Sequence, residues 1–275
     1  MRKIETEELK KIEQEILDNF VKVCNENGLT YFISGGSLIG ALRHKGFIPW
    51  DDDIDVIMPR KDYEKLFEIL PLGGRYEIRD IRNTQNYPFP FANFNDTRTF
   101  KKELKLRKKY GKCLCVNIDV FPIDNVPESQ EEIERLYRSI GRMGTKLQCV
   151  TYKFGKGQGP FKTIRKNLGI LYYRILELLG ISSVEKVVKE FIEVGTQYND
   201  TESTKCGVTL IAHYGSKEVN VKADYLPAVK VTFESKEYYA PKCYDTYLTN
   251  LYGNYMSMPP KEFQKTHHTS DCYWK

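Results

Sequence analysis

Residues 47–58 read FIPWDDDIDVIM. Four aspartates fall within five consecutive positions, and the run ends in an apolar segment that predicts a buried strand. Alternate side chains of a strand share a face, so Asp53 and Asp55 point to one side while their apolar neighbours point to the core. Asp51 shares this parity if the extended chain begins that early, whereas Asp52 faces away.

A strand that begins with several carboxylates needs a partner for their charge. Carboxylates this close repel one another, and burial makes their ionisation more unfavourable. A divalent cation removes the conflict, and an all-oxygen ligand set favours Mg²⁺, with Mn²⁺ as a second choice, over Zn²⁺. The competing interpretation is an acidic loop that ends at a strand, and for an isolated Asp-x-Asp pair we would choose it.

A glycine turn precedes the aspartates. Gly35-Gly36-Ser37 lies between an expected strand and a short expected helix, where backbone N–H groups can hold a phosphate and glycine allows close approach. Most such triplets are ordinary turns. Three basic residues lie at the end of this helix, just before the acidic segment, and they either contact phosphate or compensate the helix C-terminus; they are Arg43, His44 and Lys45.

A later strand supplies another carboxylate. Residues 113–121 read CLCVNIDVF, in which Asn117 and Asp119 share one face and the apolar residues take the other. This polar face is either solvated or placed beside Asp53 and Asp55, where Asp119 would act as a third carboxylate.

Composition indicates a folded globular protein. The 275 residues are 41% hydrophobic and 29% charged, with a net charge of +5. This charge does not by itself imply nucleic acid. Basic residues cluster at 101–112 and at 153–166, either as solvated loops or as an attraction for an anionic substrate.

Nothing in the sequence predicts export or a membrane span. The first 16 residues form a charged helical pattern without an apolar signal region. The apolar run at 168–181 is too short to span a bilayer. The seven cysteines are scattered, and Cys113 and Cys115 lack the second ligand pair of a zinc site. We therefore expect free thiols and a cytoplasmic location.

Hydrophobic periodicity predicts an α/β (α+β) fold in one catalytic unit over 1–275. The core is expected over 28–125, a helical subregion over 126–200 and a mixed C-terminal segment over 201–275. Within these regions we expect helices near 9–23, 38–44, 63–70, 133–140, 161–179, 184–192 and 242–252, and strands near 30–34, 53–58, 76–81, 89–95, 113–121 and 229–233. Ser129 and Ser182 are the expected N-caps of two helices.

The order of these motifs resembles the polymerase-beta-like nucleotidyltransferase superfamily, and three blocks resemble the LicD family of phosphotransferases. The first block is residues 35–66, GGSLIGALRHKGFIPWDDDIDVIMPRKDYEKL. The second is residues 116–124, VNIDVFPID. The third is residues 252–260, YGNYMSMPP, followed by His267 and His268. The resemblance implies a nucleotidyltransferase-like mixed sheet flanked by helices.

The resemblance also implies a reaction. LicD-like enzymes transfer phosphocholine from CDP-choline to a hydroxyl of a teichoic acid, lipopolysaccharide or related surface-glycan precursor, often lipid-linked, and release CMP. On this chain Asp53 and Asp55 match the metal pair, and Asp119 matches the third carboxylate. Gly36 and Ser37 match the phosphate loop. Asp51 matches a further acidic position, and either it or Asp119 could take the proton from the acceptor hydroxyl.

Choline recognition suggests further candidates. A quaternary ammonium binds aromatic faces, so Trp50 could form one wall of a choline site. Tyr87, Phe89 and Phe91 are alternative walls, and each of these aromatic residues is otherwise a core residue. His267 and His268 are two of four histidines, and at most one of two adjacent residues is expected to face a ligand.

Two other functions use the same residues. A true nucleotidyltransferase would move NMP onto a small molecule or an RNA end with the same carboxylates. An inactive protein that binds a glycan precursor is the alternative from another class, and the intact carboxylate set argues against it.

A helix expected over Phe161–Leu179 bears on location. Lys162, Arg165 and Lys166 precede a broad apolar surface, which suits a helix lying on an anionic membrane. The alternative, which we favour, is that this helix is buried in the core. Peripheral docking on the inner membrane face through it or through the 101–112 cluster remains a hypothesis.

Overall fold

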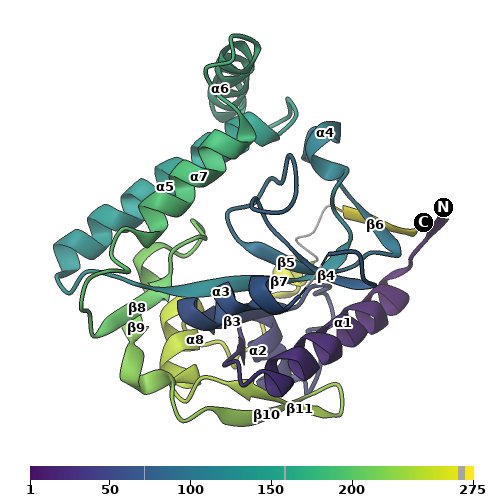
Figure 1. The fold of residues 1–275 in the computed structure, drawn as a ribbon, viewed down its shortest axis with the longest axis vertical. Coiled ribbons are helices and arrows are strands. Elements are labelled where there is room, and N and C mark those ends of the chain that lie inside the picture. Colours follow the sequence, from purple (N-terminus) through teal and green to yellow (C-terminus); the bar gives the residue numbers. More distant parts are fainter. Residues whose placement is uncertain (71, 158, 266–269) are drawn as a thin grey trace.

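The computed structural model describes residues 1–70, 72–157, 159–265 and 270–275. Its centre is a mixed sheet in the order β2–β3–β7–β5–β4, extended by β8 and β9 (Figure 1). β3 and β7 run parallel, whereas the other pairs of this sheet run antiparallel. The strands are β2 (Phe32–Ile33), β3 (Asp55–Pro59), β4 (Tyr76–Arg79), β5 (Ala92–Asp96), β7 (Val116–Asn125), β8 (Lys205–Val208) and β9 (Asn220–Val221). The predicted α/β fold with a mixed sheet is confirmed.

Helix α1 (Thr6–Glu26) packs against the sheet through the apolar face that its spacing predicts. Leu9, Ile12, Ile16 and Phe20 are all buried, and the helix contacts β5 and β7. Gly28 ends it with a left-handed φ of 61°, and the N–H of the next residue donates to the carbonyl of Cys24 at 2.9 Å. This is the 6→1 bond of a Schellman motif, which glycine allows without strain.

Three shorter helices lie close to the central strands. α2 (Gly35–Arg43) contacts β3, α3 (Arg60–Ile69) contacts β3 and β7, and α8 (Tyr244–Tyr252) follows near the end of the chain. α3 begins three residues before its predicted apolar face, directly after β3. The β3–α3 connection is therefore as short as the chain allows.

A helical part formed by α5 (Gln130–Thr151), α6 (Pro160–Leu178) and α7 (Val184–Thr196) has its own apolar cluster. α5 packs against both α6 and α7. The predicted Ser129 cap of α5 is confirmed, because its hydroxyl accepts the N–H of Glu132. The predicted Ser182 cap of α7 is wrong by one residue. Ser183 is extended and its hydroxyl accepts the N–H of Lys186, which starts the helix one residue later.

Two smaller sheets complete the molecule. β1 (Arg2–Lys3), β12 (Ser270–Trp274) and β6 (Thr99–Glu103) form one of them in that order, and β10 (Val229–Phe233) pairs with β11 (Lys236–Ala240). The first sheet joins the two ends of the chain, which lie side by side in Figure 1. The basic cluster at 101–112, expected to be a loop, includes the end of β6 and the short helix α4 (Lys108–Gly111).

Strand β7 is longer than predicted. It continues through Pro122 to Asn125 instead of ending at Phe121. Residues 116–120 pair with β5 and residues 123–125 pair with β8, so the proline falls where this edge changes partner. The missing N–H of proline is harmless at such a position.

None of the helices in the described part of the chain combines the length and the apolar character needed to cross a membrane. All seven cysteines are free thiols, as expected from the sequence.

Candidate active site

The parallel pair β3–β7 brings two predicted carboxylates together. Asp55 and Asp119 are register partners, and the N–H of Asp119 donates to the carbonyl of Ile54 at 2.9 Å. Ile54 and Val56 are fully buried, as are Ile118 and Val120. The two aspartates therefore share the opposite, half-buried face of the sheet, as strand alternation predicts.

Asp119 is held by neighbouring amides. Asn117 donates its Nδ2 to Asp119 Oδ1 at 2.7 Å, and Asn93 on β5 donates to the same oxygen. Tyr87 in turn donates its hydroxyl to Asn93 Oδ1. Two amide donors stabilise the negative charge of the carboxylate and fix its orientation.

A cavity of about 200 Å³ opens over this face of the sheet. Asp53 and Asp119 line it together with Asn93 and Asn117, and Lys101 reaches Asn117 Oδ1 at 3.5 Å. Burial alone would lower the pKa of Lys101, but the carboxylates of Glu103 and Asp119 raise it above its usual range. The cavity therefore combines three carboxylates, those of Asp53, Glu103 and Asp119, with a protonated amine.

The predicted phosphate loop lies at the first turn of α2. Gly35 has a φ of 52°, and a Cβ atom added there would lie 3.1 Å from Asp55 Oδ2. A Cβ atom on Gly36 would lie 2.6 Å from Asp51 Oδ2. Only glycine leaves room for these carboxylates against the helix N-terminus, where negative charge is favoured.

Ser37 makes a contact that the sequence did not predict. Its side chain is buried, and its hydroxyl accepts the N–H of Asp55 at 2.9 Å and points to the carbonyl of Asp53 at 3.5 Å. The serine therefore binds the backbone of the acidic segment. It positions the aspartates.

The third sequence block, residues 252–260 (the C-terminal block), contacts the same turn. The Tyr252 hydroxyl lies 3.5 Å from the Cβ position of Gly35 and accepts a hydrogen bond from Tyr214 at 2.7 Å. Burial raises the pKa of Tyr214 to about 12, and the charges of Asp55 and Asp53 act in the same direction. Both hydroxyls stay protonated at neutral pH.

Two of the predicted cations at the end of α2 contact other segments of the chain. Arg43 Nη1 donates to the carbonyls of Tyr255 at 2.8 Å and Ser257 at 3.0 Å. Lys45 adopts a φ of 60° and its carbonyl accepts the N–H of Glu234 from the β10–β11 turn. Arg43 and Lys45 thus tie the C-terminal block and a hairpin to the basic turn.

The remaining predicted ligand residues are less central. His44 accepts a hydrogen bond from Arg43 Nε at 2.9 Å and packs edge-on against Trp50, with 6.3 Å between ring centroids. Burial and the Arg43 charge lower the pKa of His44, so it is neutral at pH 7. His267 and His268 lie outside the described residues.

The alternative aromatic walls have separate positions. Phe89 lines the carboxylate cavity, and it stacks on Phe91 with 5.4 Å between ring centroids. Tyr87 is buried and holds Asn93. Phe89 is therefore the member of this group that can touch a ligand in the cavity.

A resident cation is implied by the resemblance, and its donors fit in kind. Asp53, Asp55 and Asp119 offer oxygen atoms only, which suits a hard divalent ion. In residues 1–70, 72–157, 159–265 and 270–275, no three acidic, histidine or cysteine side chains converge as a ready-made metal site. The reason is visible at α2, where the carboxylate of Asp55 lies against Gly35 and that of Asp51 against Gly36.

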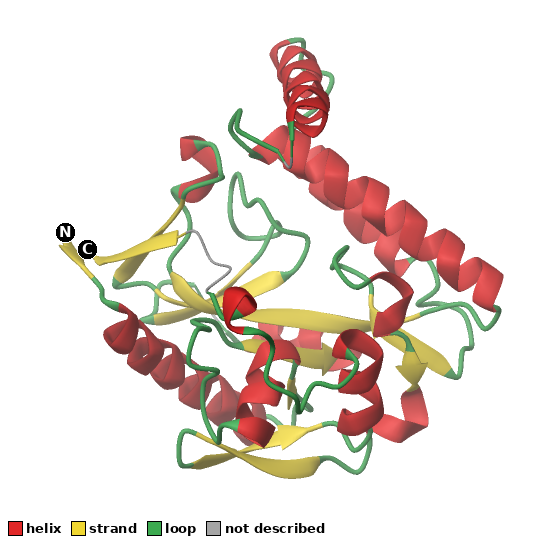
Figure 2. Ribbon diagram, turned by 180° about the vertical axis from the view of Figure 1, so that it is seen from behind, coloured by secondary structure: helices red, strands yellow, loops and turns green. Residues whose placement is uncertain are grey.

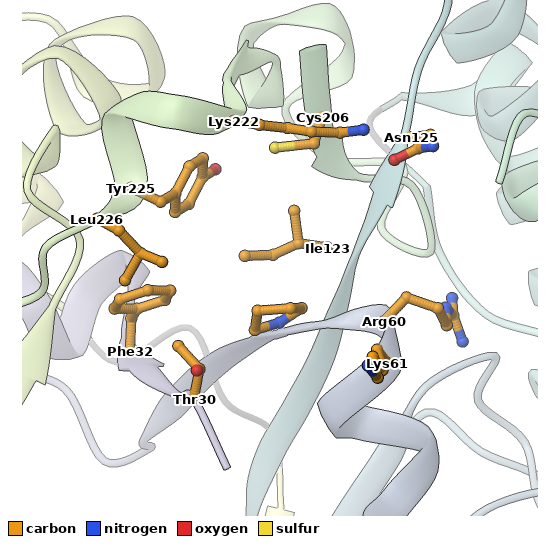
Figure 3. Close-up of a pocket in the computed structure, with 11 residues that line it drawn as sticks. Thr30, Phe32, Arg60, Lys61, Ile123, Asn125, Cys206, Lys222, Tyr225 and Leu226 are labelled. Atoms are coloured by element: carbon orange, nitrogen blue, oxygen red, sulfur yellow. The ribbon is translucent and has the colours of Figure 1, made fainter. Parts of the chain in front are cut away.

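A larger cavity of about 300 Å³ lies elsewhere (Figure 3). It is lined by Phe32, Ile123, Tyr225 and Leu226, with Lys222 reaching across one side. β3 and β7 reach it four residues beyond Asp55 and Asp119, about 13 Å along the strands. The carboxylates do not face it, so the smaller cavity is the candidate active site.

Sequence reasoning missed four residues of this site: Asn93, Lys101, Tyr214 and Tyr252. The first had a usable signal. Residues 92–96 read ANFND, in which Asn93 and Asn95 alternate with apolar residues, as Asn117 and Asp119 do on β7. Lys101 was only one member of a basic cluster. Tyr252 begins the third block of the family resemblance but was given no role there, and Tyr214 carries no local signal.

Comparison with known proteins agrees with this geometry. Residues 28–132 match the family described as LicD/FKTN/FKRP, nucleotidyltransferase domain. This span contains the α2 turn, β3, β5, β6 and most of the polar residues around the cavity. Residues 28–132 are thus similar to the nucleotidyltransferase domain of this family.

Individual proteins are also similar to this chain, over different shares of its length. The lipopolysaccharide cholinephosphotransferase LicD of Haemophilus influenzae is 29% identical over 278 residues, which cover 99% of each chain. An uncharacterized protein of Rickettsia typhi is 35% identical over 64% of this chain and 53% of its own length. Human FKRP, described as a ribitol 5-phosphate transferase, is 50% identical over 36 residues, which are 13% of this chain and 7% of that protein.

Proposed function

We propose that this protein transfers phosphocholine from CDP-choline to a hydroxyl of a surface-glycan precursor and releases CMP. The observation that carries the proposal is the cavity shared by Asp53 and Asp119, beside the Asp55–Asp119 register, in a chain similar over 99% of its length to a cholinephosphotransferase. The acceptor is a lipopolysaccharide or teichoic acid precursor, the first being the substrate class named for that relative.

The reaction is one displacement at phosphorus. The acceptor oxygen bonds to the phosphorus that carries choline, the bond from this phosphorus to the CMP oxygen breaks, and the acceptor proton goes to a carboxylate. Asp51 and Asp119 are the candidate bases. Lys101 keeps a positive charge in the cavity, where it can bind a phosphate oxygen of the donor.

Asp53, Asp55 and Asp119 would hold Mg²⁺, which would supply charge neutralisation at the pyrophosphate. Side-chain rotation from the described positions is needed to gather the three. Asn93 and Asn117 orient Asp119 for either role, as ligand or as base, because both donate to the same oxygen.

The alcohol carried by the donor is inferred from the relatives and from the aromatic residues near α2. The relatives named as transferases move two different phosphorylated alcohols, choline phosphate and ribitol 5-phosphate, and the second shares only a short segment with this chain. We place the choline near Tyr214 and Tyr252, because their rings lie 5.2 Å apart beside the α2 turn and aromatic faces attract a quaternary ammonium.

Product analysis tests the reaction. Purified protein is incubated with Mg²⁺, an acceptor glycan and either CDP-choline or nucleoside triphosphates. CMP release with labelled choline on the glycan is expected. Pyrophosphate release from triphosphates would instead make the protein a nucleotidyltransferase, and no release with tight glycan binding would make it a binding protein. Thermal shifts with CDP-choline, CDP-ethanolamine, CDP-ribitol and CDP-glycerol identify the alcohol.

Substitution of Asp119 tests the site. We expect Asp119→Asn to lower turnover by about 10²–10⁴-fold, as for loss of a base. Calorimetric titration with Mg²⁺ and CDP-choline then separates the roles, because donor binding is unchanged for a base and weakened for a metal ligand. Asp200→Asn, at an exposed turn, is the control with the same loss of charge. Normal turnover in Asp119→Asn would remove the residue from the site.

A further inference from the structure

Helix α6 carries an apolar stripe that the described chain leaves exposed. Its side chains recur at alternating spacings of three and four residues, which places them on one side of the helix. Phe161 is 77% exposed and Leu178 is 87% exposed. The stripe consists of Phe161, Ile164, Leu168, Leu171, Ile175 and Leu178. The prediction that this helix is buried in the core is therefore wrong.

The opposite side of α6 fixes its orientation. Ile170 is its buried residue, and a Cβ atom on Gly169 would lie 2.8 Å from the Cys149 sulfur of α5. α6 therefore packs closely on α5 along one side only. Figure 2 shows it at the periphery of the molecule, and the exposed fractions of its apolar residues place the stripe on the outward side.

The segment that carries the stripe is strongly basic. Between residues 153 and 178 the sequence has six basic residues and one acidic residue, Glu177. Glu177 is itself paired with Arg107 and Lys109. The basic residues are Lys153, Lys156, Lys162, Arg165, Lys166 and Arg174.

We propose that α6 docks on an anionic lipid bilayer, with the stripe inserted at the interface and the cations at the headgroups. An outward apolar stripe alone would also suit a second copy of the chain. A second copy, however, would bring two sets of like charges together, whereas an anionic lipid surface neutralises them. Charge complementarity therefore selects the membrane.

The docking helix is connected to the carboxylate cavity. Tyr152 lines the cavity, and Lys166 of α6 lies 5.9 Å from the centre of its ring. The N–H of Lys153 donates to the carbonyl of Lys105, another cavity residue, at 2.9 Å. Docking through α6 would thus hold one wall of the cavity close to the lipid surface. The inference stands independently of the proposed reaction.

Vesicle sedimentation tests the docking. The full chain is mixed with phosphatidylglycerol or phosphatidylcholine vesicles at low and high salt. Binding is expected to the anionic vesicles and to weaken with salt. Leu168→Glu with Leu171→Glu should reduce it by about tenfold or more. Leu72→Glu, which changes a leucine 53% exposed outside α6, should bind like the wild type.

A second pair of variants tests the charges. Lys162→Gln with Arg165→Gln should weaken binding to anionic vesicles by about 30-fold at low salt, whereas Arg138→Gln with Arg142→Gln on α5 removes equal charge and should change it little. Circular dichroism confirms that each variant is folded. Absence of vesicle binding by the wild type overturns the proposal. So does lipid-free self-association that the Leu168→Glu, Leu171→Glu variant abolishes without any loss of vesicle binding.

Discussion

Single atoms decide the shape of the turn between β2 and α2. Gly36 has no side chain, and the space that a Cβ atom would need is taken by the Asp51 carboxylate at 2.6 Å. A distance under 3.0 Å forces something to move. The flexible end of Asp51 gives way more easily than the backbone of the helix, so a substitution here acts on the carboxylate.

We expect Gly36→Ala to displace Asp51 and to lower turnover by about 10²-fold, since displacements on the order of 1 Å have effects of this size. The protein should stay folded. Gly141→Ala is the matched control, because a Cβ atom there meets nothing within 4 Å inside α5. It should keep full activity and gain up to about 1 kcal/mol in the free energy of unfolding. A fully active Gly36→Ala enzyme would show that Asp51 need not stay against this turn.

Glu218 is a buried acid that the proposed reaction does not use. Burial raises its pKa to about 8, and its Oε2 has no hydrogen-bond partner within the described residues. The folded protein therefore holds a proton that the unfolded chain releases near pH 4.5. The stabilisation from this proton is complete below about pH 4.5 and is lost as the pH rises through 8.

We expect Glu218→Gln, which mimics the protonated acid, to raise the free energy of unfolding by about 2 kcal/mol at pH 8.5 and to change it little at pH 4.5. Urea titration at both pH values measures the difference. A wild type and variant with parallel pH profiles would mean that Glu218 is not protonated in the folded protein.

At the scale of elements, α6 depends on few contacts. Besides α5, it reaches the α4 region through Glu177, whose carboxylate accepts hydrogen bonds from Arg107 and the Tyr110 hydroxyl and also pairs with Lys109. Burial acts against ionisation, but these donors outweigh it and lower the pKa of Glu177 to about 2. The junction is therefore complete above about pH 4.5 and is lost as the pH falls towards 2.

We expect Glu177→Gln to increase amide hydrogen exchange in α6 by about 5–10-fold while α1 and β7 exchange as in the wild type, because local opening follows local contacts. Mass spectrometry of the exchanged peptides measures this. Glu134→Gln on α5, an exposed acid, should leave α6 unchanged. Unchanged exchange in Glu177→Gln would mean that packing on α5 alone holds the helix.

At the scale of the whole molecule, Asp124 joins elements that are far apart in the chain. It lies near the end of β7 with its side chain fully buried, and Arg60 of α3 binds both carboxylate oxygens at 2.7 and 2.8 Å. Asn199 and Thr209 donate to it at 2.7 and 2.6 Å. Asp124 falls in the same sequence block as Asp119, yet its hydrogen bonds connect separate segments of the chain.

We expect Asp124→Ala to lower the free energy of unfolding by about 3–5 kcal/mol, because it leaves the Arg60 charge without its partner. Chemical denaturation measures the loss. Asp200→Ala at an exposed turn should change stability by less than about 0.5 kcal/mol. A small loss for Asp124→Ala would show that Glu64, which also contacts Arg60, replaces the missing carboxylate.

The sequence by itself determined what depends on local backbone geometry. The 3–4 spacing of α1 and the glycine that ends it follow from helix periodicity. The outward direction of Asp55 beside the buried Ile54 and Val56 follows from strand alternation, although β3 begins at Asp55, two residues later than predicted. The resemblance of residues 35–66 added the family, because a turn, a helix and a strand that are continuous in sequence keep their pattern in one block.

The tertiary structure decided which segments meet. Asn93 reaches Asp119 only because β5 pairs with β7, and Tyr252 reaches Gly35 only because the C-terminal block folds onto α2. Local periodicity does not determine the order of strands in a sheet or the packing of distant segments. For the same reason the sequence could not choose between core and surface for α6. Apolar spacing shows that a helix has an apolar face. Only the fold shows whether other segments of the chain pack against that face.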